Sequence, residues 1–206
     1  LWFKLMLFEL DALRESLPVD LTISQHYLRR LRSILKLLTS SFEVIETMRP
    51  YDFLQFREKL QPASGLQSLQ FREIEFVCGR KDPRFLRLFG KEEEKRLARR
   101  FQEASVWDIY VRLLPHQGLQ NQNDAQVIAS ILQILSQPDT HSLGPITEAL
   151  IDLDESFNLW RSRHLQMVMR MIGAKPGTGE ESVAKLVNGG YASMGSGGAD
   201  YLKTTL

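Results

Sequence analysis

The chain has 206 residues, of which 43% are apolar and 25% are charged, a mixture typical of globular domains and unlike that of disordered chains. Its 26 basic and 25 acidic residues give a net charge of +1, so the composition indicates no nucleic-acid partner. The single cysteine, Cys78, excludes an intramolecular disulfide framework and a cysteine-based zinc site, and it favours a reducing, cytoplasmic location.

The first ten residues are the most apolar stretch of the chain, but no segment is apolar and uncharged for long enough to span a membrane. Lys4 and Glu9 interrupt this stretch, and it lacks the basic start and the small-residue cleavage site of a signal peptide. We therefore predict that it is the middle of a buried helix. Because the chain does not begin with Met, we expect further residues upstream of it.

Apolar residues recur at every third or fourth position through most of the chain, which predicts helices joined by short loops and no strands. The expected helices cover residues 27–48, 52–60, 66–78, 92–103, 105–114, 124–135 and 146–173. Thr22 or Ser24 would cap the first of them, and Gly79 would end the third. Ser105 and Asp108 have the spacing of a reciprocal N-terminal cap.

The side chains also predict which helix faces are buried. The helix over residues 92–103 is heavily charged, so we expect most of it to face solvent. In the helix over residues 124–135, the apolar side consists of Val127, Ile128, Ile131, Leu132 and Leu135. In the last long helix, a stripe with bundle-core spacing consists of Ile146, Leu150, Leu153, Phe157, Trp160, His164, Met167 and Met171.

His164 is the one polar member of that stripe. Burying an imidazole among Trp and Met side chains is unfavourable unless its nitrogens find partners, so it is either a hydrogen-bonded core histidine or a metal ligand. No second histidine, and no carboxylate three or four residues away, accompanies it, which argues against zinc and di-iron sites. A haem needs only one axial imidazole from the protein and suits this setting. We predict that His26, His116 and His141 lie on the surface.

Two further segments carry candidate binding residues. Arg57 follows Phe53 by one helical turn, with Ser64 close behind, and an arginine there can bind a carboxylate against an apolar wall. The alternative is a surface ion pair of Arg57 with Glu58 or Glu73. The Gly-Thr-Gly around Thr178 suggests close approach of backbone to a ligand, but it matches neither a phosphate-binding loop nor a dinucleotide fingerprint. It opens a glycine-rich segment, residues 174–202, in which residues 180–188 have helical composition.

Taken together, these segments resemble the tryptophan 2,3-dioxygenase family over nearly the whole chain and in the expected order. The matching stretches are Leu1-Trp2-Phe3-Lys4; Glu46-Thr47-Met48; Phe56-Arg57-Glu58; Pro62-Ala63-Ser64-Gly65-Leu66-Gln67-Ser68-Leu69-Gln70-Phe71-Arg72; Trp160-Arg161-x-Arg163-His164-x-x-Met167-Val168-x-Arg170-Met171-Ile172-Gly173; and Lys175-Pro176-Gly177-Thr178-Gly179.

The resemblance implies that residues 1–206 form one all-α domain, a helical bundle that holds haem b between long helices and assembles as a homotetramer. It implies that His164 is the axial ligand of the haem iron and that Arg57 holds the carboxylate of an amino acid. Thr178 would bind the ammonium and carboxylate end of the substrate, Phe53 would wall the indole pocket, and Ser64 would lie near haem and substrate. The implied reaction inserts O₂ across the indole C2–C3 bond of L-tryptophan and gives N-formylkynurenine, with no nucleic-acid or membrane partner.

The chain departs from the family pattern in two ways. The family's distal histidine and its neighbouring phenylalanine would lie upstream of Leu1. In addition, residues 180–194 form an insertion before the family pattern resumes at Gly195. Because the substrate loop is changed, a second function stays possible as an alternative. In it, the protein is a monooxygenase that acts on tryptophan or on a modified tryptophan or indole. Further alternatives are a non-catalytic haem gas sensor, against which Arg57 and Thr178 argue, and a helical interaction module without cofactor.

Overall fold

The computed structural model describes residues 1–61 and 65–173, apart from the side chain of Leu66. Every regular element in these two ranges is a helix, which confirms the all-α prediction. The α-helices are α1 (Trp2–Ser16), α2 (Leu21–Glu46), α3 (Pro50–Arg57), α4 (Leu69–Cys78), α5 (Lys91–Gln102), α6 (Val106–Leu113), α7 (Asp124–Ser136) and α8 (Gly144–Ile172). The short 3-10 helices are Glu58–Leu60, Gly65–Gln67, Pro83–Leu88, Leu114–Gln117 and Pro138–Thr140.

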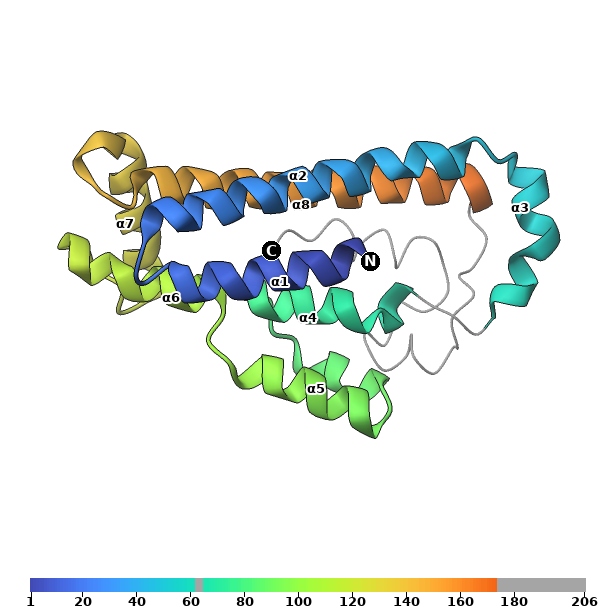
Figure 1. The fold of residues 1–206 in the computed structure, drawn as a ribbon, viewed down its shortest axis with the longest axis horizontal. Helices are drawn as coiled ribbons and strands as arrows, with labels where there is room; N and C mark the ends of the chain where they lie inside the picture. Colours follow the sequence, from blue (N-terminus) through green and yellow to red (C-terminus); the bar gives the residue numbers. More distant parts are fainter. Residues whose placement is uncertain (62–64, 174–206) are drawn as a thin grey trace.

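The two longest helices, α2 and α8, lie side by side and run in the same direction along the long axis of the molecule (Figure 1). The helix α1 runs antiparallel to α2, α4 packs against α1, and α5 forms the outermost layer below α4. At one end of the long pair, α3 stands across the helix axes and contacts α8. At the other end, α7 packs against α8. None of the helices in the described ranges is both long and apolar enough to cross a membrane.

The core forms where the apolar stripes of the long helices meet. From α1 it takes Met6, Leu10 and Leu13, which are fully buried, and it continues along the inner face of α2. From α8 it takes most of the predicted stripe, in which Leu150 and His164 are only half-buried. Removing such side chains from water is the main stabilising contribution to a bundle of this kind.

Local capping signals set several helix ends as predicted. The Ser105 hydroxyl accepts a hydrogen bond from the Asp108 N–H at 3.0 Å, and the Asp108 carboxylate accepts one from the Ser105 N–H at 2.8 Å, so the reciprocal cap of α6 is confirmed. Gly79 ends α4 with φ +135°, a conformation that side chains rarely adopt. A Cβ on Gly79 would also lie 2.9 Å from the Cβ of Trp107, so only glycine fits there.

The first long helix begins earlier than predicted. It starts at Leu21, and its cap is Asp20 rather than Thr22 or Ser24. The Asp20 carboxylate accepts hydrogen bonds from the N–H groups of Thr22 and Ile23 at 2.8 and 3.0 Å. A carboxylate at this position satisfies two unpaired backbone donors and also matches the helix dipole.

Two predicted burial patterns are wrong in part. In α7, Ile128 and Leu132 are 58% and 61% exposed, whereas the inner face carries Val127, Ser130 and Ile134. The reason is Ser130, whose hydroxyl donates to the Gln120 carbonyl at 2.7 Å and turns that face inward. The opening segment is helical but not buried all round, because Phe8 on α1 is 62% exposed.

Candidate functional site

His164 lies on α8 at the edge of a cluster of aromatic rings that is centred on Trp160. Its ring centroid is 5.4 Å from that of Phe42 on α2 and 5.7 Å from that of Trp160 on α8. Both neighbouring rings lie within 19° of parallel to the imidazole. Since the Phe42 and Trp160 centroids are themselves 6.1 Å apart, the three rings form a triangle rather than a stack.

The same cluster draws on segments that are far apart in the sequence. Trp160 contacts Phe3 of α1 edge-on at 5.9 Å and Phe71 of α4 at 5.2 Å. Phe3 belongs to the family-like stretch over residues 1–4, and Phe71 belongs to the one over residues 62–72. Trp160 and His164 share the stretch over residues 160–173 on α8. The fold therefore brings these stretches together around the ring of Trp160, which in turn contacts the imidazole.

The surroundings of His164 favour a neutral imidazole. Burial lowers the pKa of His164 below its ordinary value, because the charged form loses its hydration. Its Nδ1 atom is buried, and the described part of the chain provides no hydrogen-bond partner for it. Among the described residues, no three histidine, cysteine or carboxylate side chains gather to hold a metal ion. A neutral, solitary imidazole matches the one-ligand requirement of haem.

The residue before His164 in the chain is fixed to α2. Arg163 binds the Glu46 carboxylate through both terminal nitrogens of its guanidinium, and the Nη1–Oε1 distance is 2.7 Å. The hydrogen bond from Arg163 lowers the pKa of Glu46, and the same contact raises the pKa of Arg163. The last turn of α2 is thereby joined to the turn of α8 that carries the imidazole.

Phe53 and Arg57 lie one turn apart on α3, as predicted, and both are half-buried. The Phe53 ring packs edge-on against Phe56 at 5.3 Å and also against the main core. Because α3 contacts α8, the fold brings the helix with the two substrate candidates onto the helix with His164. Glu73, one alternative partner of Arg57, is buried on α4 and accepts hydrogen bonds from Arg96 at 2.6 and 2.7 Å.

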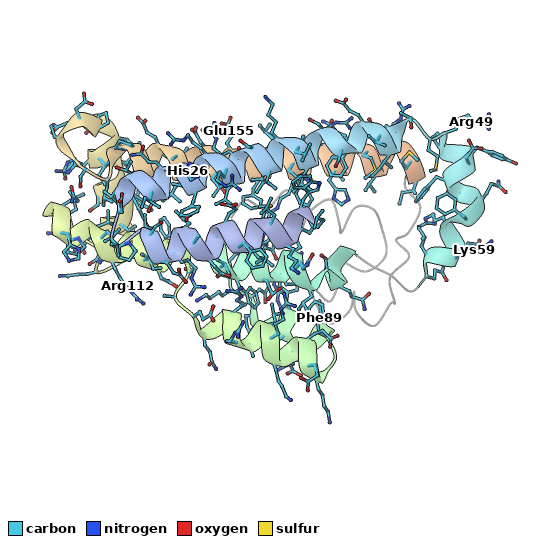
Figure 2. All side chains as sticks on the ribbon, in the orientation of Figure 1. His26, Arg49, Lys59, Phe89, Arg112 and Glu155 are labelled. Atoms are coloured by element: carbon cyan, nitrogen blue, oxygen red, sulfur yellow. The ribbon has the colours of Figure 1, made fainter. Side chains whose placement is uncertain are left out.

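The other predicted binding residues lie outside the part of the chain that the structure describes. These are Ser64 and Thr178, together with the segment over residues 174–202, its insertion and the helix expected over residues 180–188. Of the remaining histidines, His26 and His116 are exposed as predicted, whereas His141 is half-buried rather than on the surface. Figure 2 shows His26 on the half of α2 that lies away from α3.

Sequence reasoning missed a buried ion cluster behind the aromatic rings. Glu75 on α4 lies 2.7 Å from Arg72 and 3.2 Å from Arg161, and all three side chains are almost completely buried. The Arg72 guanidinium also lies 4.3 Å from the centre of the Phe85 ring. The signal available in the sequence was the spacing of Arg72 and Glu75, two charged residues three positions apart in a largely apolar helix. Their burial, however, depends on the helices that cover them.

A separate cavity of about 480 Å³ opens between α1, α4, α6 and α8. Its wall is mostly apolar and includes Leu10, Trp107 and Phe157, with Cys78 and Asp154 among its polar residues. Burial raises the pKa of Cys78 to about 12, so its thiol stays protonated at neutral pH. The cavity contains none of the predicted site residues.

Comparison with known proteins gives consistent matches. The profile of the family described as tryptophan 2,3-dioxygenase matches residues 1–128. The tryptophan 2,3-dioxygenase of Nocardioides sp. (strain ATCC BAA-499 / JS614) is 37% identical over 215 residues, covering 100% of this chain and 75% of that protein. The protein of the same name from Herpetosiphon aurantiacus is 39% identical, covering 100% and 78%. That from Anaeromyxobacter sp. (strain K) is 36% identical, covering 100% and 77%.

Proposed function

Because the chain belongs to the tryptophan 2,3-dioxygenase family, a family of oxidoreductases, we propose that it oxidises L-tryptophan with O₂. The proposed reaction inserts both oxygen atoms across the indole C2–C3 bond and gives N-formylkynurenine. The observation that carries this proposal is the imidazole of His164, held among aromatic rings from α2 and α8, in a chain with these relatives.

The cofactor of the proposal is haem b, and the residues present fit it. His164 would hold the iron through one nitrogen of its imidazole, whose charged form is disfavoured by burial. Phe42 and Trp160 provide the apolar surroundings in which a porphyrin is held. When bound, the haem supplies the iron that activates O₂.

The substrate would be held by side chains of this chain. In the proposal, Arg57 binds the tryptophan carboxylate through its planar guanidinium, and Phe53 packs against the indole ring. Thr178 would bind the ammonium and carboxylate end, and Ser64 would lie near haem and substrate. The half-burial of Phe53 and Arg57 on α3 supports these roles, because a partly buried guanidinium binds a carboxylate more strongly than an exposed one.

The proposal includes a homotetramer in the cytoplasm. Large apolar side chains such as Phe8 and Val44 are exposed on α1 and α2, which supports assembly with further copies. The single cysteine, Cys78, supports a reducing compartment. Light scattering coupled to size-exclusion chromatography measures the oligomeric state, and a monomeric mass would contradict this part of the proposal.

The test is incubation of the haem-loaded protein with L-tryptophan under ¹⁸O₂, followed by mass spectrometry of the product. A dioxygenase gives N-formylkynurenine with two labelled oxygen atoms. A product with one labelled atom would instead establish the monooxygenase alternative, which the insertion at residues 180–194 leaves open. If the protein binds haem but forms no product, the proposal is overturned and the non-catalytic gas sensor becomes the preferred alternative.

A variant that lacks residues 180–194 separates the two oxygenase reactions further. If the insertion adapts the protein to a modified tryptophan, its removal shifts turnover toward plain tryptophan. Turnover of tryptophan and of ring-methylated analogues by both forms measures this shift. An intact protein that already prefers tryptophan and inserts two oxygen atoms would show that the insertion does not set the substrate.

A further inference from the structure

We infer that Phe42 and the Glu46–Arg163 ion pair are positioning residues that set the orientation of the His164 imidazole. This inference rests on the proposed role of His164 as the haem ligand. Phe42 and Glu46 lie one turn apart on the same face of α2, and that face meets Trp160, Arg163 and His164 of α8. The family-like Glu46-Thr47-Met48 stretch, which the proposed reaction does not use, acquires a role in this way.

The imidazole needs such support because its Nδ1 nitrogen finds no hydrogen-bond partner among the described residues. A histidine that binds a metal usually donates its other ring N–H to a carboxylate, a carbonyl or a water molecule, and that hydrogen bond fixes the ring. Here Nδ1 of His164 is buried, and residues 1–61 and 65–173 provide no hydrogen-bond partner for it. The aromatic contacts of the imidazole among the described residues are two rings within 19° of parallel, of which Phe42 comes from the neighbouring helix.

The ion pair keeps Phe42 in place. Rotation of α2, or a slide along α8, would move the Phe42 ring off the imidazole, and the bidentate Arg163–Glu46 contact opposes both movements. Both side chains are partly buried, with 27% and 17% of their surface exposed, so water screens the pair less than a surface pair. A second α2–α8 ion pair, Arg32–Asp152, is more exposed and lies several turns from His164.

The first experiment compares Phe42→Leu with Phe157→Leu in the haem-loaded protein. Phe157 is also a buried phenylalanine that faces the core from α8, and its ring makes no contact with His164 among those found in the described residues. The readouts are the rate of haem transfer to excess apomyoglobin and the rhombicity of the ferric electron paramagnetic resonance signal. The rhombicity depends on the orientation of the axial imidazole, so a general loss of packing does not mimic it.

We expect Phe42→Leu to release haem about 10-fold faster, the lower end of the usual effect of removing support from a metal ligand. Its rhombicity should change, while Phe42→Tyr, which retains the ring, and Phe157→Leu keep the signal of the unmodified protein. The inference is overturned if Phe42→Leu leaves both readouts unchanged, or if Phe157→Leu changes them equally.

The second experiment compares Glu46→Gln with Asp152→Asn, which break the two α2–α8 ion pairs. Glu46→Gln should change the rhombicity in the same direction as Phe42→Leu, and Asp152→Asn should leave it unchanged. Equal behaviour of the two variants would remove the ion pair from the inference. Uptake of haem by the unmodified protein, and its loss in His164→Ala, tests the proposed function separately, and a chain that takes up no haem overturns both.

Discussion

At the scale of single residues, the proposed chemistry depends on an imidazole that stays neutral. A protonated imidazole has no lone pair for a metal, and the surroundings of His164 disfavour that form because burial lowers its pKa. The flanking aromatic rings leave the ring little freedom to turn away. These features make His164 the side chain whose loss should matter most.

His164→Ala should abolish tight haem binding, because it removes the imidazole that is proposed to hold the iron. The Soret absorption of the protein after removal of unbound haem measures the effect. His26→Ala is the matched control, since this histidine is exposed on α2 (Figure 2). A His164→Ala protein that keeps the Soret spectrum of the unmodified chain would show that the iron ligand lies elsewhere.

Arg57→Ala should raise the KM for tryptophan strongly and leave the haem spectrum nearly intact. Truncating one partner of a desolvated charge pair costs about 2–5 kcal/mol, part of which is the stranded second charge. Arg57→Lys should restore only part of the affinity, because lysine lacks the planar, two-pronged geometry.

Steady-state kinetics of the Arg57 variants are compared with those of Arg49→Ala. Arg49 is an exposed arginine at the start of the α3 segment, opposite the end marked by Lys59 (Figure 2), and it pairs with Asp52 at 2.7 Å. We expect Arg49→Ala to leave KM unchanged. Arg57 is not a substrate ligand if Arg57→Ala shows the KM of the unmodified protein.

At the scale of helices, α6 offers a measurable local interaction. Ser105→Ala removes the hydroxyl that accepts from the Asp108 N–H, and the Ser105 side chain is almost completely buried. Loss of an N-terminal cap costs about 1 kcal/mol. Urea denaturation of the haem-free protein should show this decrease, while Ser33→Ala on the exposed side of α2 should have little effect. Equal stability of both variants would mean that the cap contributes nothing measurable.

At the scale of the whole molecule, ion pairs between helices link the stability of the fold to pH. Glu46 joins α2 to α8, and Glu103 joins the end of α5 to Arg14 of α1. Burial alone would raise the pKa of Glu103, but hydrogen bonds and the charges of Arg14 and Arg100 lower it overall. For Glu46 the hydrogen bond from Arg163 lowers the pKa.

The free energy of unfolding should therefore fall when the pH drops below the ordinary glutamate value of 4.5. The folded carboxylates hold their protons less tightly than the unfolded ones, so their contribution is complete above that value and is lost as pH passes through the lowered pKa. Urea denaturation between neutral and acid pH measures the slope. Glu103→Gln should flatten it, and an unchanged slope in this variant would rule out Glu103 as a contributor.

Much of this protein was determined by interactions between residues close together in the sequence. The cap at Ser105 and Asp108, the end of α4 at Gly79 and the apolar spacing along α8 act within a few residues, so the sequence alone predicts them. The place of His164 in that spacing indicated either a core histidine or a metal ligand, and its role as haem ligand, implied by the resemblance, stays a prediction. The family-like stretches added the roles of Phe53 and Arg57, which stay predictions.

The tertiary structure decided what depends on which helices meet. The apolar pattern of α7 is compatible with more than one buried face, and the contact of Ser130 with Gln120 left Ile128 and Leu132 in solvent. Arg163 and Glu46 are 117 residues apart in the chain, and their contact exists only because α2 and α8 run side by side. Periodicity gives each helix a buried side, but the partner of that side is chosen by packing across the whole chain, which no local signal encodes.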